Sequence, residues 1–202
     1  MTSRKSASVR RDDILSATLD IAFKVGPTRV TTGMIADRLN LTQPAIYKHF
    51  SSKDDIWAAV ATYLSQKIND NVTRNQSETG APDTQVRSLV LDHLELVRDN
   101  PALPEIMLMR DAKGSHAIVQ TSIQSSIGAL RAALVANAAA AVKQGLFRAD
   151  IDVNDIATLI FGIIQSLVLR MLVTRDPEML ISNGERLLDL QLSGFMKAGD
   201  MQ

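Results

Sequence analysis

Residues 31–57 decide the fold, and they read TTGMIADRLNLTQPAIYKHFSSKDDIW. The first part predicts a short helix that begins at Thr31 or Thr32, because a threonine hydroxyl can cap the free backbone N–H groups of a first turn. Its apolar residues recur at helical spacing and are Ile35, Ala36 and Leu39. Asn40 then stands where a sharp turn needs a positive φ, which asparagine tolerates better than most non-glycine residues.

A second short helix follows this turn. It begins near Thr42 or Gln43 and accepts Pro44 in its first turn, where a missing N–H has little effect. Its buried residues are Ile46 and Phe50. Two short helices joined by about four residues form a helix-turn-helix, which offers the outward face of its second helix to the DNA major groove. Here that face carries Gln43, Ala45, Tyr47, Lys48 and His49.

The rest of the chain also shows helical periodicity, and no alternating, strand-like segment of any length occurs. One helix runs from Asp12 to the Gly26-Pro27 pair, and another runs from Lys53 to about Val72, followed by a polar loop at 73–82. Further helices are expected at about 83–99, 102–110, 115–144, 152–174 and 177–198. The sequence therefore predicts an all-α fold, with a three-helix helix-turn-helix domain at 1–53 and a second helical domain at 54–202.

The quoted stretch resembles the N-terminal domain of TetR-family regulators. The resemblance is carried by A-x-x-L at 36–39 and by I-Y-K-H-F followed by S-S-K-D at 46–54, and it covers about a quarter of the chain, roughly residues 12–59. Two positions depart from the family pattern. Gly33 stands where many members carry an arginine or polar residue able to reach DNA, and Asn40 replaces the usual turn glycine.

The resemblance implies DNA contacts for eight residues. Phosphate contacts are implied for Thr32, Tyr47, His49 and Lys53, and readout of base edges for Gln43, Pro44, Ala45 and Lys48. The chemistry agrees in part, because glutamine can pair bidentately with adenine, lysine can donate to guanine, and a methyl group can touch that of thymine. Hydroxyl and ammonium groups suit phosphate oxygens.

Charge is distributed unevenly along the chain. The 22 basic residues balance the 22 acidic ones overall, but residues 1–53 hold nine basic residues against four acids, which leaves the remainder acidic. A basic head indicates an anionic partner for that part of the chain. Arg4, Lys5, Arg10 and Arg11 precede or begin the first helix, where they form either a mobile arm that reaches DNA or a solvated charge run.

The helix at 152–174 is apolar almost all round, so it must be buried on two sides. In the family the last two helices form a two-fold dimer, which places two heads against successive major grooves about 34–36 Å apart on a near-palindromic operator. The candidate interface residues are Ile160, Phe161, Ile163, Leu167, Leu188, Leu192 and Phe195. The alternative is a monomer whose last helix alone covers the apolar surface.

Family members commonly hold a small-molecule pocket in the C-terminal domain. The candidate ligand-binding residues are Trp57, Tyr63, His93, Met107, Arg110, Phe161 and Gln165, with His116 as a further possibility. Methionines line adaptable pockets, and one histidine or arginine in an apolar wall can orient a polar ligand group. Equally, a lone histidine on an apolar face is usually a hydrogen-bonded core residue, and methionine stripes are usually core.

The sequence lacks the motifs that are typical of enzymes, metal sites and nucleotide-binding proteins. The chain has no cysteine, its three histidines include no pair at metal-ligand spacing, and no G-x-S-x-G, P-loop or G-x-G-x-x-G motif occurs. We therefore expect no enzyme, metal or cofactor. The absent cysteines fit a reducing compartment, no secretory signal is visible, and polar residues interrupt the least polar stretch, 156–173. These features favour a cytoplasmic protein without a membrane partner.

The resulting expectation is a homodimeric transcriptional regulator that binds double-stranded operator DNA. It is expected to act as a repressor and to be released by an unidentified small-molecule effector. Two alternatives remain: a ligand-independent dimeric DNA-binding protein, and a cofactor-free helical enzyme. A cavity in the C-terminal domain distinguishes the ligand-gated regulator from the ligand-independent binder.

Overall fold

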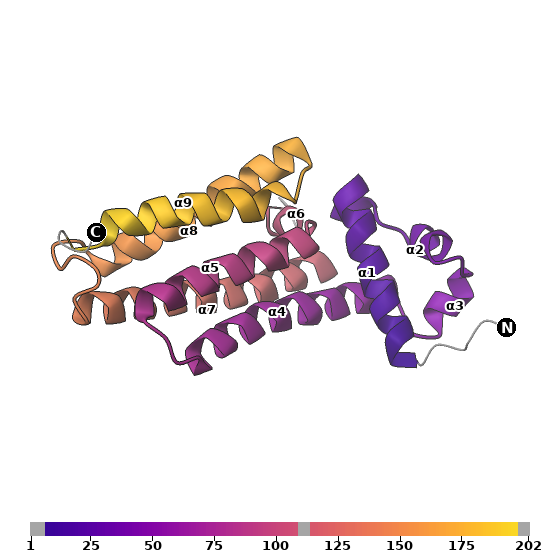
Figure 1. Cartoon of the computed structure of the whole chain (residues 1–202). Coiled ribbons are helices and arrows are strands. Elements are labelled where there is room, and N and C mark those ends of the chain that lie inside the picture. The colour runs from indigo at the N-terminus through magenta and orange to yellow at the C-terminus, as the bar shows by residue number, and fades with distance from the viewer. Residues whose placement is uncertain (1–6, 109–113, 198–202) are drawn as a thin grey trace. The chain divides into compact units, whose positions relative to one another are not determined.

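The structure, a computed structural model, describes residues 7–108 and 114–197, and these are helical almost throughout (Figure 1). Along the described chain there is no strand, only an isolated antiparallel bridge between Phe147 and Met196. The elements in chain order are α1 (Ala7–Val25), the 3-10 helix η1 (Pro27–Arg29), α2 (Thr32–Arg38), α3 (Gln43–Tyr47), α4 (Lys53–Ser77), α5 (Pro82–Asp99), α6 (Leu103–Met107), α7 (Ser115–Lys143), α8 (Val153–Thr174) and α9 (Met179–Phe195). The predicted all-α fold is confirmed.

The chain divides into two compact units. The head unit comprises Met1–Ser65 with Asn100–Gln124, and the body unit comprises Gln66–Asp99 with Ser125–Gln202. The units interleave along the chain, whereas the domains expected from the sequence are two consecutive segments. As a result, α4 and α7 each contribute their N-terminal part to the head unit and their C-terminal part to the body unit.

The helix-turn-helix forms as predicted. Thr31 is the N-cap of α2, where its hydroxyl oxygen accepts a hydrogen bond from the Met34 N–H at 3.2 Å. Asn40 adopts the left-handed conformation with φ 53°, and Pro44 lies in the first turn of α3. The apolar residues of both helices pack inward, and Ile35, Ala36, Ile46 and Phe50 are all buried. Leu39 is only half-buried.

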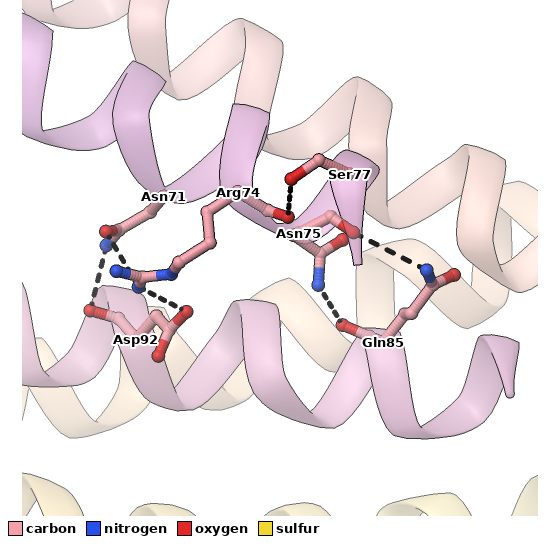
Figure 2. A network of polar contacts seen from close by, with 6 residues as sticks. All are labelled: Asn71, Arg74, Asn75, Ser77, Gln85 and Asp92. Atoms are coloured by element: carbon pink, nitrogen blue, oxygen red, sulfur yellow. Dashed lines mark hydrogen bonds and ion pairs between the residues drawn. The ribbon is translucent and has the colours of Figure 1, made fainter. Parts of the chain in front are cut away.

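Helix α4 extends further than predicted, because the expected loop from Thr73 is helical as far as Ser77 (Figure 2). Its polar residues find partners on α5, which stabilise this end of the helix. The Arg74 guanidinium pairs with the Asp92 carboxylate at 2.7 Å, and the Asn71 amide donates to the Asp92 carbonyl oxygen at 3.1 Å. A polar sequence that would form a loop in isolation is thus held as helix by tertiary contacts.

Asn75 lies at the centre of this network and is fully buried. Its amide donates to the Gln85 carbonyl oxygen at 2.8 Å, and the Gln85 amide donates back to the Asn75 carbonyl oxygen at 3.4 Å (Figure 2). The Asn75 side-chain oxygen also accepts from the Asn137 amide at 2.8 Å. These bonds join α4, α5 and α7 within the body unit. They also satisfy a polar side chain that would be costly to bury unpaired.

In the body unit, α5, α8 and α9 pack against one another, and α8 and α9 lie side by side (Figure 1). The approach of α5 to α9 depends on Gly184, because a Cβ atom there would collide with the Leu94 side chain. Asp152 is the N-cap of α8, and its carboxylate accepts from the Asn154 N–H at 2.7 Å. The Asp176 carboxylate accepts from the Glu178 N–H at 3.1 Å in the turn before α9, which begins at Met179 and not at the expected residue 177.

Two helices of the described chain, α7 from residue 116 and α8, are long and apolar enough to cross a membrane. About a third of the most apolar window of each, 33%, is buried inside the protein. Core helices of soluble proteins pass the same test of length and composition, so this property alone carries little weight.

The buried amide network yields a stability prediction. Replacing Asn75 by Ala removes the hydrogen bonds that its side chain makes with the Asn137 amide and the Gln85 carbonyl, so we expect the free energy of unfolding to fall by about 1–3 kcal/mol. Gln76→Ala is the matched control, because its side chain is exposed and the change should stay within about 0.5 kcal/mol. Urea unfolding followed by circular dichroism measures both, and equal effects of the two variants would contradict a structural role for the network.

Candidate nucleic-acid interface

Helix α3 presents a polar face to solvent. The side chains of Gln43, Pro44, Tyr47 and Lys48 are exposed. Ala45 and His49 are half-buried. The helix itself ends at Tyr47, so Lys48 and His49 extend the face from the turn that follows it. The structure therefore brings six of the eight predicted DNA-contacting residues onto one surface.

The seventh, Lys53, opens α4. Its side chain is half-buried, and the Ser52 hydroxyl oxygen caps this helix by accepting from the Asp55 N–H at 3.1 Å. The free N–H groups of a helix N-terminus and a lysine side chain both favour a bound anion. Asp54 and Asp55 lie in the same first turn and offset part of this positive charge.

The eighth residue, Thr32, is differently placed, since only 9% of it is exposed. Its hydroxyl donates to the Gln43 side-chain oxygen Oε1 at 3.2 Å and lies 3.3 Å from the Tyr47 hydroxyl. Thr32 is thus engaged by two residues of α3 within the protein. Sequence reasoning assigned it to phosphate and did not foresee these partners.

Gly33 provides the space in which the Gln43 amide lies. A Cβ atom built at Gly33 would meet the amide nitrogen Nε2 at 3.4 Å and the Thr31 hydroxyl oxygen at 3.7 Å. These are ordinary van der Waals distances, so Gly33 and Gln43 are neighbours and a Cβ atom at position 33 would fit without a clash.

Arg11 of α1 contacts two residues that follow α3. Its guanidinium donates to the His49 carbonyl oxygen and lies over the Phe50 ring, 4.0 Å from the ring centroid. Arg10 lies 3.9 Å from the Asp13 carboxylate. Both arginines belong to α1, so this half of the predicted basic arm is part of a helix. Arg4 and Lys5 lie outside the described residues.

The candidate ligand-binding residues are divided between the two units. In the head unit Trp57 is buried and its ring lies 4.7 Å from that of His116, while Tyr63 and Met107 are half-buried. In the body unit His93 is buried, Phe161 is half-buried beside Arg131, and Gln165 is exposed. Arg110 lies outside the described residues. Gln165 faces solvent in the single chain, so it does not line a closed cavity there.

His93 and His116 stand out among these residues. Burial lowers the pKa of His93 to about 4, and its Nδ1 atom has no hydrogen-bond partner among the residues described. Burial also lowers the pKa of His116, although its bond to the Pro27 carbonyl acts in the opposite direction. Burial therefore favours the neutral form of both imidazoles. A lone histidine on an apolar helix face is usually a hydrogen-bonded core residue, but the Nδ1 atom of His93 lacks such a bond.

The structure divides the candidate dimer-interface residues into two groups by their burial within the single chain. Five of the predicted residues are buried within the chain itself and fill its own core: Ile160, Leu167, Leu188, Leu192 and Phe195. Phe161 and Ile163 are half-buried. Helical periodicity identified two apolar sides on these helices but could not decide which one faces the body.

The opposite, outward side of α8 and α9 carries a shallow groove of about 480 Å³. Its apolar lining comes from Leu159, Gly162, Ile163, Leu187, Leu190 and Gly194. Leu159 is 49% exposed and Leu190 is 67% exposed. Leu169 and Val173, further along α8, are also exposed. Exposed apolar residues gathered in this way are typical of a contact surface.

The chain is 27% identical over 99 residues to the nucleoid occlusion factor SlmA of Aliivibrio fischeri strain MJ11, a match that covers 48% of the chain and 50% of that protein. The chain thus matches about half the length of this curated relative.

Two solved structures share the fold over almost the whole chain. The ketosteroid transcriptional regulator KstR2 of Mycobacterium tuberculosis superposes with a TM-score of 0.74 at 18% identity, covering 98% of this chain and 97% of that one. The transcriptional regulator FadR from Bacillus subtilis in complex with stearoyl-CoA gives 0.67 at 18% identity, covering 91% and 98%.

Family matches cover both parts of the chain. Residues 14–60, which contain the helix-turn-helix, match the bacterial regulatory proteins of the tetR family, and residues 105–182 match the tetracyclin repressor-like C-terminal domain. Together the two segments span more than half of the chain. With the exposed recognition face on α3 and this pair of matches, the chain belongs to the TetR family of DNA-binding transcriptional regulators.

Proposed function

We propose that this regulator is a cytoplasmic repressor that binds a near-palindromic operator as a homodimer and releases it when a small molecule binds. The observation that carries the proposal is the exposed polar face of α3 on a head with more basic than acidic residues. Residues 1–53 supply DNA recognition, and residues 54–202 supply dimerisation and effector binding. Its action is binding rather than catalysis.

The proposed division of DNA contacts follows from chemistry and exposure. We assign the reading of base edges to four residues. Three of them, Gln43, Pro44 and Ala45, belong to α3, and the fourth, Lys48, directly follows that helix. Tyr47, His49 and Lys53 contact phosphates, since they lie at the end of α3 and at the start of α4. Phosphate contacts position the head, and base contacts select the sequence.

A second copy of the chain is the proposed occupant of the outer face of α8 and α9. The two-fold symmetry of a dimer presents the same face from both copies and buries the exposed leucines of each against the other. It also supplies two heads for two half-sites. Phe161 and Ile163, at the edge of the buried side, remain candidates for this contact.

The effector proposal has two supports. One is the pattern of ligand-bound relatives, since FadR from Bacillus subtilis was solved with stearoyl-CoA. The other is His93, a buried polar side chain with an unpartnered Nδ1 atom that can pair with a polar group of a ligand. A true effector must lower operator affinity, and saturating operator must lower effector affinity by the same factor.

A ligand-independent dimeric DNA-binding protein is the second candidate. It is favoured by the match to SlmA, whose name as a nucleoid occlusion factor states no effector. Such a protein would keep the head and the dimer, and no small molecule would change its DNA affinity.

Substitutions in the head separate positioning contacts from readout contacts. Lys53→Ala should weaken binding to all DNA sequences and flatten the salt dependence by up to about one unit of slope. Gln43→Ala or Lys48→Ala should change which operator is preferred, by roughly 1–3 kcal/mol for a good bidentate contact. Selection from randomised DNA followed by salt titration measures both. Lys143→Ala, a change at an exposed lysine of α7, is the control and should alter neither property. A change of preference in Lys53→Ala with unchanged non-specific affinity would contradict these roles.

A substitution in the groove on α8 and α9 tests whether this surface forms the dimer contact. Leu190→Glu places a carboxylate in the proposed contact, so it should give a helical monomer with weakened operator binding. Ile118→Glu is the matched control, because Ile118 is 65% exposed but does not line the groove, and it should stay dimeric. Light scattering and circular dichroism report mass and helicity. An unmodified protein that is monomeric at micromolar concentration would refute the dimer.

The buried histidine predicts a pH dependence of stability. The unfolded chain protonates His93 near its ordinary pKa of 6.5, whereas the folded chain resists protonation until about pH 4. Stability should therefore fall as the pH drops from 6.5 to 4, by up to about 3 kcal/mol from this residue, and its contribution should be constant above and below that window. His93→Leu should remove this part of the slope in urea unfolding at a series of pH values. An identical slope in the variant would show that His93 is not buried neutral.

A further inference from the structure

Arg11 belongs to α1, yet its side chain lies against the end of α3. Its guanidinium donates to the His49 carbonyl oxygen and lies over the Phe50 ring, 4.0 Å from the ring centroid. Helix α1 packs against α2, and α2 packs against α3, so this side chain adds a direct tie from α1 to the end of the recognition helix. The guanidinium thus has partners within the protein before any DNA is bound.

The turn that follows α3 offers a site for such a tie. The N–H groups of His49 and Phe50 both bond to the Ile46 carbonyl oxygen, at 2.9 and 3.2 Å, so the backbone continues to turn beyond Tyr47. The last carbonyl groups of a helix have no partner in that helix and carry partial negative charge. A basic side chain that bonds to one of them is favoured there by its charge. Arg11 caps the C-terminal end of α3 in this way.

Lys48 lies in the turn that these bonds hold. Its own N–H bonds to the Pro44 carbonyl oxygen at 3.2 Å, and the residue after it is the one to which Arg11 donates. The Lys48 side chain is exposed, and its ammonium group is carried on a flexible four-carbon stem. Such a group meets one particular base only if the backbone that carries it is held in place by neighbouring residues.

We propose that Arg11 is a positioning residue for base readout, which holds the end of α3 and thereby sets where Lys48 meets a base. Its contacts are with the protein, so it acts on the preference between sequences. A phosphate contact would instead add to the affinity for every sequence and to its salt dependence. The inference rests on the proposed reading of a base by Lys48.

The test compares Arg11→Ala with Arg10→Ala in the full-length protein. Both variants lose one positive charge from α1, but Arg10 lies 3.9 Å from the Asp13 carboxylate of the same helix. Fluorescence anisotropy at several salt concentrations gives the affinity for an operator selected from randomised DNA and for unrelated DNA. Arg11→Ala should lower the ratio of these affinities about tenfold, the size of one base contact, whereas Arg10→Ala should leave it unchanged. The affinity for unrelated DNA and its salt dependence should be the same in both variants.

Two further variants isolate the cause. In the Lys48→Ala background, Arg11→Ala should have little additional effect on the ratio, because Arg11 acts through that residue. Arg11→Lys keeps the charge but loses the planar group that lies over the Phe50 ring, so it should restore only part of the ratio. Thermal unfolding checks that Arg11→Ala folds. Arg11→Met, which keeps a long stem without a donor, replaces it if it does not.

The outcomes separate this inference from the function on which it rests. If the unmodified protein binds all sequences equally, base-specific binding itself fails. If it is selective but Arg11→Ala and Arg10→Ala have the same ratio, the positioning role is wrong. An equal loss of affinity for all DNA in Arg11→Ala, with a salt dependence lower than that of Arg10→Ala, would make Arg11 a phosphate contact and overturn the inference. Full recovery in Arg11→Lys, or an undiminished effect in the Lys48→Ala background, would overturn it as well.

Discussion

A helix of five residues has no stability of its own in water, and α3 is such a helix. Everything that the head does depends on contacts that hold α3 in place. Ile46 of α3 is itself completely buried, Phe50 is buried just beyond the helix, and the Arg11 guanidinium covers the Phe50 ring. Together with the turn at Asn40, these contacts replace the missing intrinsic stability with packing.

The same contacts limit which groups remain for DNA. Arg11 uses its guanidinium on the His49 carbonyl and the Phe50 ring, and Thr32 uses its hydroxyl on Gln43 and Tyr47. Some polar groups near the proposed DNA-binding surface therefore bond within the protein, and only the remaining ones are available to DNA. The residues that remain exposed, including Gln43 and Lys48, carry the proposed readout.

Much of this architecture could be predicted from the sequence, because it rests on local rules. The caps at Thr31 and Asp152, the positive φ at Asn40 and the helix end at Gly26 all follow from single residue types. The end of α4 could not be predicted in this way. The stretch after Val72 is polar, and its helical state depends on Asp92, Gln85 and Asn137, which are distant in sequence.

The candidate site shows the same limit. A helix that is apolar on two sides gives no local signal for which side faces its own core, so Ile160 and Leu188 could not be distinguished from Leu159 and Leu190. Side-chain hydrogen bonds such as that between Thr32 and Gln43 leave no pattern in the sequence either. The exposed residues were predictable as a motif, but their mutual contacts were not.

The short recognition helix also explains why the outer face of α8 and α9 matters to the head. Five residues can read only a few bases, and each good contact contributes about 1–3 kcal/mol of discrimination. One head alone therefore has limited specificity. Joining two heads makes the second binding event intramolecular, which raises affinity without any new contact to DNA. In the proposed dimer, apolar packing between two bodies thus compensates for the small size of α3. A change in the body that alters the spacing of the two heads weakens binding even when each α3 is intact.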